Sequence, residues 1–161
     1  MTPIQITRCK VLIRELKLLK ANTVKPKFFM GNWMSLFLTK RRTTRELHQD
    51  IMEATRNPCG TACCLAGKAG LIPAIRRMGF KWDVYTKDQA FDLFGNARAG
   101  FQFGSHLGDA AVINFFGQLA FSDVFMNIYN IHTLLQGIKA LEAVIKAGEL
   151  LLEEEAEYDN S

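Results

Sequence analysis

The chain has 161 residues, 48% of them hydrophobic and 22% charged, which excludes a disordered protein and suits one domain with its own core. Its net charge of +4 conceals a split, since residues 1–81 carry a net +12 and residues 82–161 a net −8. Such a split indicates either an anionic partner for the first half or attraction between the two halves.

The cysteine pattern and the N-terminus argue against a secreted disulfide framework. Cys63 and Cys64 are adjacent, and charged residues lie where a signal peptide would be apolar. We therefore expect free thiols and a cytoplasmic location. The apolar run 110–121 is too short to span a bilayer, so we expect core helices there and no membrane contact.

The first predicted element is an amphipathic helix over about 3–21. Apolar residues recur there at helical spacing, and Thr2-Pro3 is a typical helix start. Residues 27–38 are aromatic and irregular, which indicates a short extended piece followed by a helical turn. A short helix is then expected to end before Pro58, because the residue preceding a proline avoids the helical region.

The rest of the chain continues this mainly helical pattern. In order, it predicts a helix over about 60–70, one turn over 73–78, an extended segment over 79–85, a short helix over 86–95, a glycine-rich loop over 95–108, and helices over 109–121 and 123–155. The predicted fold class is mainly α: a compact single-domain helical fold over 1–152 with a glycine-rich loop and a long C-terminal helix. An acidic C-terminal tail over 153–161 follows this domain.

Three of the four cysteines lie in the run 57–67, beside small residues. Cys59 precedes a predicted helix start, where the local positive potential would stabilise a thiolate, so it is the candidate catalytic nucleophile. The spacing links no histidine to it as a base. The favoured reading is structural, with a thin helix that fits between larger ones. Because only one ligand cluster is present, we expect no metal and no cofactor.

Two further sets of residues are candidates for binding. Arg98, Ser105 and His106 in the glycine-rich loop could hold a small anion, although the loop matches no phosphate-binding motif and a plain surface loop is the favoured reading. Basic residues early in the chain could meet an acidic host protein, namely Lys10, Arg14, Lys17, Arg41 and Arg42. Nucleic-acid binding by this basic half, with Trp33 stacking on bases, is kept as an alternative.

Three short motifs resemble those of small, mostly uncharacterised proteins of bacteriophages and bacteria. They are a Phe-x-Met-x-x-Trp segment from Phe28 to Trp33, a Cys-Gly-Thr-x-x-Cys-x-Ala-Gly run over 59–67, and an Ala-x-x-Leu-Phe-Gly turn over 90–95. The resemblance implies a genomic setting more than a mechanism. Lys68 stands where the resemblance leads us to expect an aromatic residue or a histidine. If that position bore catalysis in relatives, this chain would lack it.

With the phage setting that the resemblance implies, the leading interpretation is a non-enzymatic binding protein of the host cytoplasm. It would inhibit a host protein or sequester a small anionic, nucleotide-like signalling molecule used in host immunity. A cysteine-dependent enzyme using Cys59 and a nucleic-acid-binding accessory protein are the alternatives. Self-association through an apolar stripe over 131–145 is left open, with packing of that stripe on the protein's own core favoured.

Overall fold

The computed structural model describes residues 1–21, 27–28, 34–35, 62–63, 65–84, 99–127 and 129–159. The helices in these ranges are α1 (Pro3–Ala21), α3 (Leu65–Leu71), α4 (Pro73–Arg77), α5 (Asp109–Phe116), α6 (Gln118–Ala120), the π-helical turn η1 (Phe121–Phe125) and α7 (Leu134–Asp159). The strands are β1 (Lys27–Phe28), β2 (Met34–Ser35), β3 (Ala62–Cys63), β4 (Lys81–Val84), β5 (Ala99–Phe103) and β6 (His106–Leu107). The mainly α fold with a long C-terminal helix is therefore confirmed.

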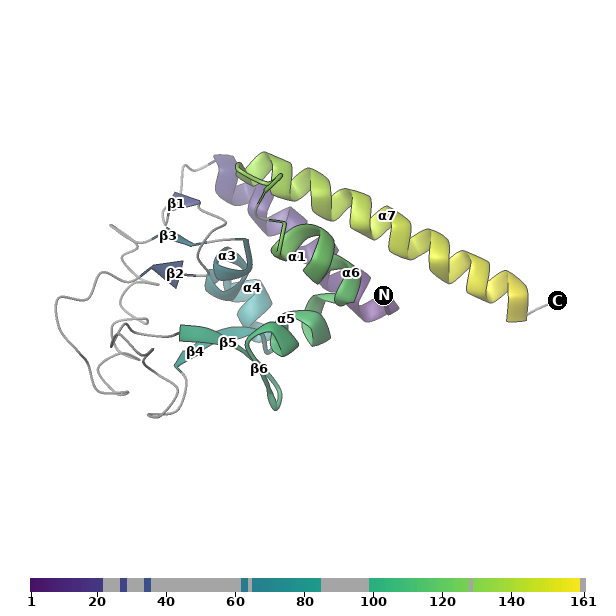
Figure 1. Ribbon diagram of the computed structural model, residues 1–161, viewed down its shortest axis with the longest axis horizontal. Coiled ribbons are helices and arrows are strands. Elements are labelled where there is room, and N and C mark those ends of the chain that lie inside the picture. Colours follow the sequence, from purple (N-terminus) through teal and green to yellow (C-terminus); the bar gives the residue numbers. More distant parts are fainter. Residues whose placement is uncertain are drawn as a thin grey trace.

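Two small sheets accompany the helices (Figure 1). In the first, β3 lies between β1, to which it is parallel, and β2, to which it is antiparallel. In the second, β4, β5 and β6 form an antiparallel meander. The sequence predicted a glycine-rich loop over 95–108, but residues 99–107 of that segment form the β5–β6 hairpin. Gly104, with a φ of +57°, supplies its turn.

Helices α1 and α7 pack along each other, and their apolar stripes supply much of the core (Figure 1). On α7, Ile138, Leu141 and Ile145 are buried. Glycines allow close approach, since a Cβ added at Gly137 would lie 3.3 Å from a Leu65 methyl carbon. The stripe predicted over 131–145 thus packs mainly on the protein's own core, as favoured.

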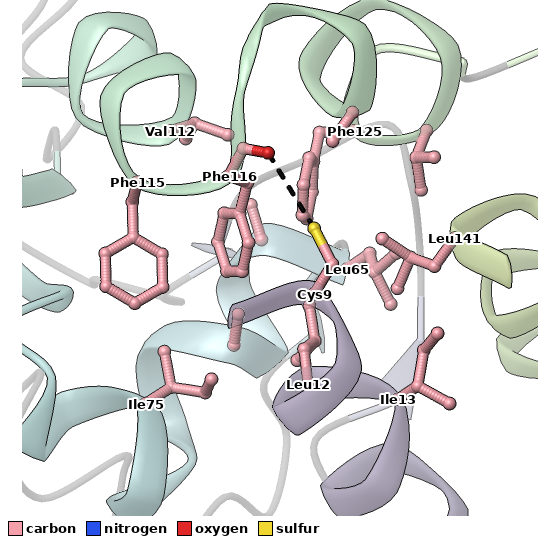
Figure 2. Packing of buried hydrophobic residues seen from close by; sticks show 14 of the residues in the cluster. Cys9, Leu12, Ile13, Leu65, Ile75, Val112, Phe115, Phe116, Phe125 and Leu141 are labelled. Carbon is pink, nitrogen blue, oxygen red and sulfur yellow. Dashed lines mark hydrogen bonds between the residues drawn. The ribbon is translucent and has the colours of Figure 1, made fainter. Parts of the chain in front are cut away.

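Phenylalanine rings form a cluster in the core, and Figure 2 shows three of them, Phe115, Phe116 and Phe125. The Phe80 ring lies 5.0 Å from Phe101 and 5.1 Å from Phe115, centroid to centroid. Phe116 continues the cluster to Phe125 at 4.8 Å. Aromatic contacts at these separations add to the stability from burial alone. Within residues 65–84 and 99–127, the phenylalanines are therefore core residues or pack against the core.

The two predicted helices over 109–121 and 123–155 have different bounds in the structure. Gly117, at φ +97°, ends α5, and its N–H donates to the Ile113 carbonyl. The long helix begins only at Leu134, because Thr133 and Gln136 form a reciprocal capping box. Thr133 Oγ1 accepts from the Gln136 N–H at 3.2 Å, and Gln136 Oε1 accepts from the Thr133 N–H at 3.0 Å.

Candidate anion-binding site

Polar side chains on α1 cover the C-terminal carbonyls of α5, which have no partner within their own helix. Three such bonds are Gln5 Nε2 to Asn114 O at 3.3 Å, Arg8 Nη1 to Phe115 O at 3.2 Å, and Cys9 Sγ to Phe116 O at 3.7 Å. Figure 2 shows the last of these, with the Cys9 thiol among buried apolar side chains. This arrangement fixes the first turns of α1 against the end of α5.

Arg8 is held in this contact by aromatic rings as well. Its guanidinium carbon lies 4.4 Å from the centroid of Phe115 and 4.8 Å from that of Phe103, within the range of a cation–π interaction. Partial burial lowers the pKa of Arg8 from its usual value, although an arginine stays protonated at neutral pH. Within the part of the chain that the structure describes, no carboxylate lies within 4.0 Å of its nitrogens.

The β5–β6 hairpin adds a histidine to the face of the sheet that carries Phe103, one of the two rings at Arg8. His106 pairs directly opposite Phe103, and directly opposed residues of an antiparallel pair project from the same face of the sheet. His106 therefore lies on the face against which Arg8 packs, and it is exposed, as is Ser105 in the turn. We name the group of Arg8, Phe103 and His106 the Arg8 corner.

The chemistry of the Arg8 corner suits an anion. A guanidinium has five N–H donors in a planar fork that matches the oxygens of phosphates and carboxylates. Among the residues that the structure describes, Arg8 donates one such bond, from Nη1 to Phe115 O. Because the rings fix the position of the group, a ligand would not have to order it first.

The structure brings together only part of the predicted anion site. Ser105 and His106 lie side by side at the exposed end of the hairpin. Arg98 lies outside the described residues. Arg8 supplies the cation at this place, and no clear sequence pattern marks it because its ring and carbonyl partners lie about a hundred positions away, 107 in the case of Phe115. Its one local signal is the polar pair Gln5 and Arg8 at helical spacing beside the apolar stripe.

The predicted partner-binding residues of α1 form ion pairs on the protein surface. Lys10 pairs with Glu149 at 2.6 Å and Lys17 with Glu142 at 2.7 Å, which links α1 to α7. Arg14 pairs with its neighbour Glu15 at 2.6 Å. The basic side chains remain 56–64% exposed. Part of the charge split is thus internal, through surface pairs of small energetic worth.

Of the other predicted site residues, Arg41, Arg42 and Cys59 lie outside the described ranges, so the roles proposed for them stay predictions. The run that contains Cys59 appears in the structure through β3 and α3. Cys63 pairs with Phe28 and Met34 in a strand, where the sequence predicted the start of a helix. Residues 65–70 of α3 are all buried, which agrees with the predicted thin helix between larger elements.

No protein-family model, curated protein or solved structure matches this chain. In the ranges that the structure describes, no three or more His, Cys, Asp or Glu residues gather as a metal site would require. Nor does any helix of those ranges have the length and apolarity needed to cross a membrane. The geometry of the Arg8 corner is therefore the main guide to function.

Proposed function

We propose that this is a phage-type, cytoplasmic binding protein that sequesters a small anionic, nucleotide-like molecule of the host at the Arg8 corner. The observation that carries the proposal is the state of Arg8. Its charge is held in place by two rings and a carbonyl, and no carboxylate of the described chain neutralises it. Lys10 and Lys17 on the same helix each have such a carboxylate.

The ligand would contact groups of different chemistry at this corner. Its phosphate would accept hydrogen bonds from Arg8 and from His106, and Ser105 in the adjoining turn could add a hydroxyl donor. Arginine planes also stack on nucleobases, so the base of a nucleotide would offer Arg8 a second contact besides the phosphate. This combination favours a nucleotide over a simple inorganic ion.

The host setting rests on the resemblance of the 59–67 motif to small phage and bacterial proteins. A phage protein without enzymatic activity can help its phage by lowering the free concentration of a host signalling molecule. Inhibition of an acidic host protein by Lys10, Arg14 and Lys17 is the second candidate. It is favoured by the exposure of their ion pairs, which an acidic partner could replace at small cost.

Isothermal titration calorimetry at low ionic strength tests ligand binding, with ATP and inorganic pyrophosphate as probes. Arg8→Gln should weaken binding of ATP roughly 10- to 100-fold, the usual worth of a charge-assisted hydrogen bond. Arg14→Gln, on the same helix, is the matched control and should bind as the wild type does. His106→Ala, at an exposed position, should also weaken binding and does not disturb the core.

Two results would overturn the proposal for this site. One is the absence of heat from either probe with the wild-type protein at millimolar concentration. The other is equal affinity of the wild type, Arg8→Gln and His106→Ala when all three have the same circular dichroism spectrum. Loss of binding in Arg14→Gln alone would instead move the anion site to the exposed face of α1.

A further inference from the structure

The last turns of α7 form a surface that the proposed ligand site does not use. We name residues 150–159 the α7 tip. Figure 1 shows the tip running past the N-terminus of α1 and away from α4 and β4. Leu150 and Leu151 are 51% and 49% exposed, although both are large and apolar. Exposed apolar side chains gathered on one helix end are typical of a protein contact.

The charge of the α7 tip indicates the chemistry of its partner. Five carboxylates lie there with no lysine or arginine among them, on Glu153, Glu154, Glu155, Glu157 and Asp159. None forms an ion pair with another residue that the structure describes. Carboxylates are also unfavourable at a helix C-terminus, where the helix dipole is negative. A basic partner would relieve both the mutual repulsion and the unfavourable dipole interaction.

The same chain presents a complementary surface elsewhere. Arg76 and Arg77 end α4 and Lys81 begins β4, with the exposed Met78 between them. We name these four residues the basic corner. In the described part of the chain, none of its three charged groups forms an ion pair. It therefore offers the cations that the tip lacks, together with an exposed apolar side chain.

We propose that the α7 tip of one molecule docks on the basic corner of a second copy. A second copy is favoured over a foreign protein because this chain supplies both surfaces, and each lacks an ion-pair partner among the described residues. In Figure 1 the two surfaces are well separated, so the contact forms between molecules. It joins different patches of the two copies and is therefore a head-to-tail interface, which closes into a ring or extends into a chain.

Sedimentation velocity over a range of protein concentrations tests the proposal. The wild type should show a mass that rises with concentration at low ionic strength and falls toward the monomer near 0.5 M salt, where the Debye length is only about 4 Å. The tip variant, Glu153→Lys with Glu154→Lys and Glu157→Lys, should be monomeric. Lys146→Glu changes an exposed charge of α7 outside the tip and is the control, which should behave as the wild type.

A charge exchange makes the test specific for the two surfaces. The corner variant, Arg76→Glu with Arg77→Glu and Lys81→Glu, should also be monomeric on its own. An equimolar mixture of tip and corner variants should form mixed assemblies in which the two variants alternate, because the reversed tip meets the reversed corner and the native tip meets the native corner. A monomeric wild type at all concentrations, association that survives in the tip variant, or a mixture of folded variants that stays monomeric would overturn the proposal.

The experiment remains decisive if the corner variant fails to fold. The tip side chains are exposed, so the tip variant should keep the wild-type circular dichroism spectrum. Loss of self-association in that folded variant alone supports the docking of the tip, and its persistence overturns it. Self-association and ATP binding are separate readouts, so failure of one proposal leaves the other standing.

Discussion

Helix α1 is held on its two sides by different means. Toward α5, Gln5, Arg8 and Cys9 donate hydrogen bonds to carbonyls at the end of that helix, and the bonds of Arg8 and Cys9 are partly or fully shielded from solvent. Toward α7, the polar contacts are the exposed ion pairs of Lys10 and Lys17, and buried apolar side chains hold the two helices together.

The two sides of α1 thus carry two kinds of charged group: those that hold helices in place, and those that can exchange their partner. A partly buried donor that satisfies a helix-end carbonyl cannot be removed without leaving that carbonyl unpaired. An exposed ion pair can be exchanged for water or for a partner at little cost. One nitrogen of Arg8 satisfies a helix-end carbonyl, and the remaining donors of its guanidinium are still available to a ligand. The candidate site lies at Arg8 for this reason.

The largest expected loss of stability is at the contact between α1 and the end of α5. A Cβ at Gly117 would lie 3.0 Å from both Met1 Cγ and Gln5 Oε1, and the φ of +97° itself disfavours a side chain. Gly117→Ala should therefore lower the free energy of unfolding by about 1–3 kcal/mol from backbone strain alone, with the clash adding to it. Urea unfolding followed by circular dichroism measures this.

Gly104→Ala is the matched control for that substitution. Gly104 also has a positive φ, of +57°, but a Cβ there would meet no atom within 4 Å. Its replacement should cost about 1 kcal/mol, from backbone strain alone. Equal losses in the two variants would contradict the close contact between the N-terminus of α1 and the end of α5.

A smaller effect on stability is expected from the Cys9 thiol, which is fully buried on the α5 side of α1. Burial raises its pKa from 9.0 to about 12, so the unfolded chain loses this proton first as the pH rises. The contribution of the protonated thiol to the stability of the fold is fully present below pH 9. It is lost as the pH rises from about 9 to about 12. At pH 10 the loss should be about 1 kcal/mol.

Cys9→Ala isolates that contribution, because it removes the thiol together with its titration. The variant should be less stable than the wild type at pH 8, and the difference between the two should shrink as the pH rises above 9. Urea unfolding at pH 8, 9 and 10 measures it. A difference that stays constant over this range would contradict the assigned burial of the thiol.

The smallest effect is expected on the α7 side. A double-mutant cycle with Lys10→Ala and Glu149→Ala should give a coupling energy below about 1 kcal/mol, which disappears in high salt. A coupling of several kcal/mol would mean that these ion pairs help to hold α1 in place. The two sides of the helix would then not differ as described.

Much of the fold could be predicted from the sequence because its local signals are strong. The spacing of apolar residues placed α1 and its buried face, and proline and glycine bounded α4. The start of α7 was misplaced because the apolar pattern continues across 123–133, while the capping box at Thr133 decides where the helix begins. The β5–β6 hairpin was read as a loop because its glycines obscured the alternation of Phe101 and Phe103.

The candidate site was predictable only in part, for a physical reason. His106 and Ser105 stand out as polar residues among glycines and aromatics. In the sequence, Arg8 is not distinguished from the other basic residues. Its role depends on two rings and a carbonyl that only the tertiary fold brings to it. Contacts of such sequence separation leave no local pattern in a single chain.

Native mass spectrometry of the protein purified from the cells in which it acts tests the central claim most directly. The account predicts a mass excess in the wild type that matches a phosphate-bearing small molecule, and its absence from Arg8→Gln prepared in the same way. A bare wild-type mass, or the same excess in both proteins, would contradict capture of such a ligand at the Arg8 corner.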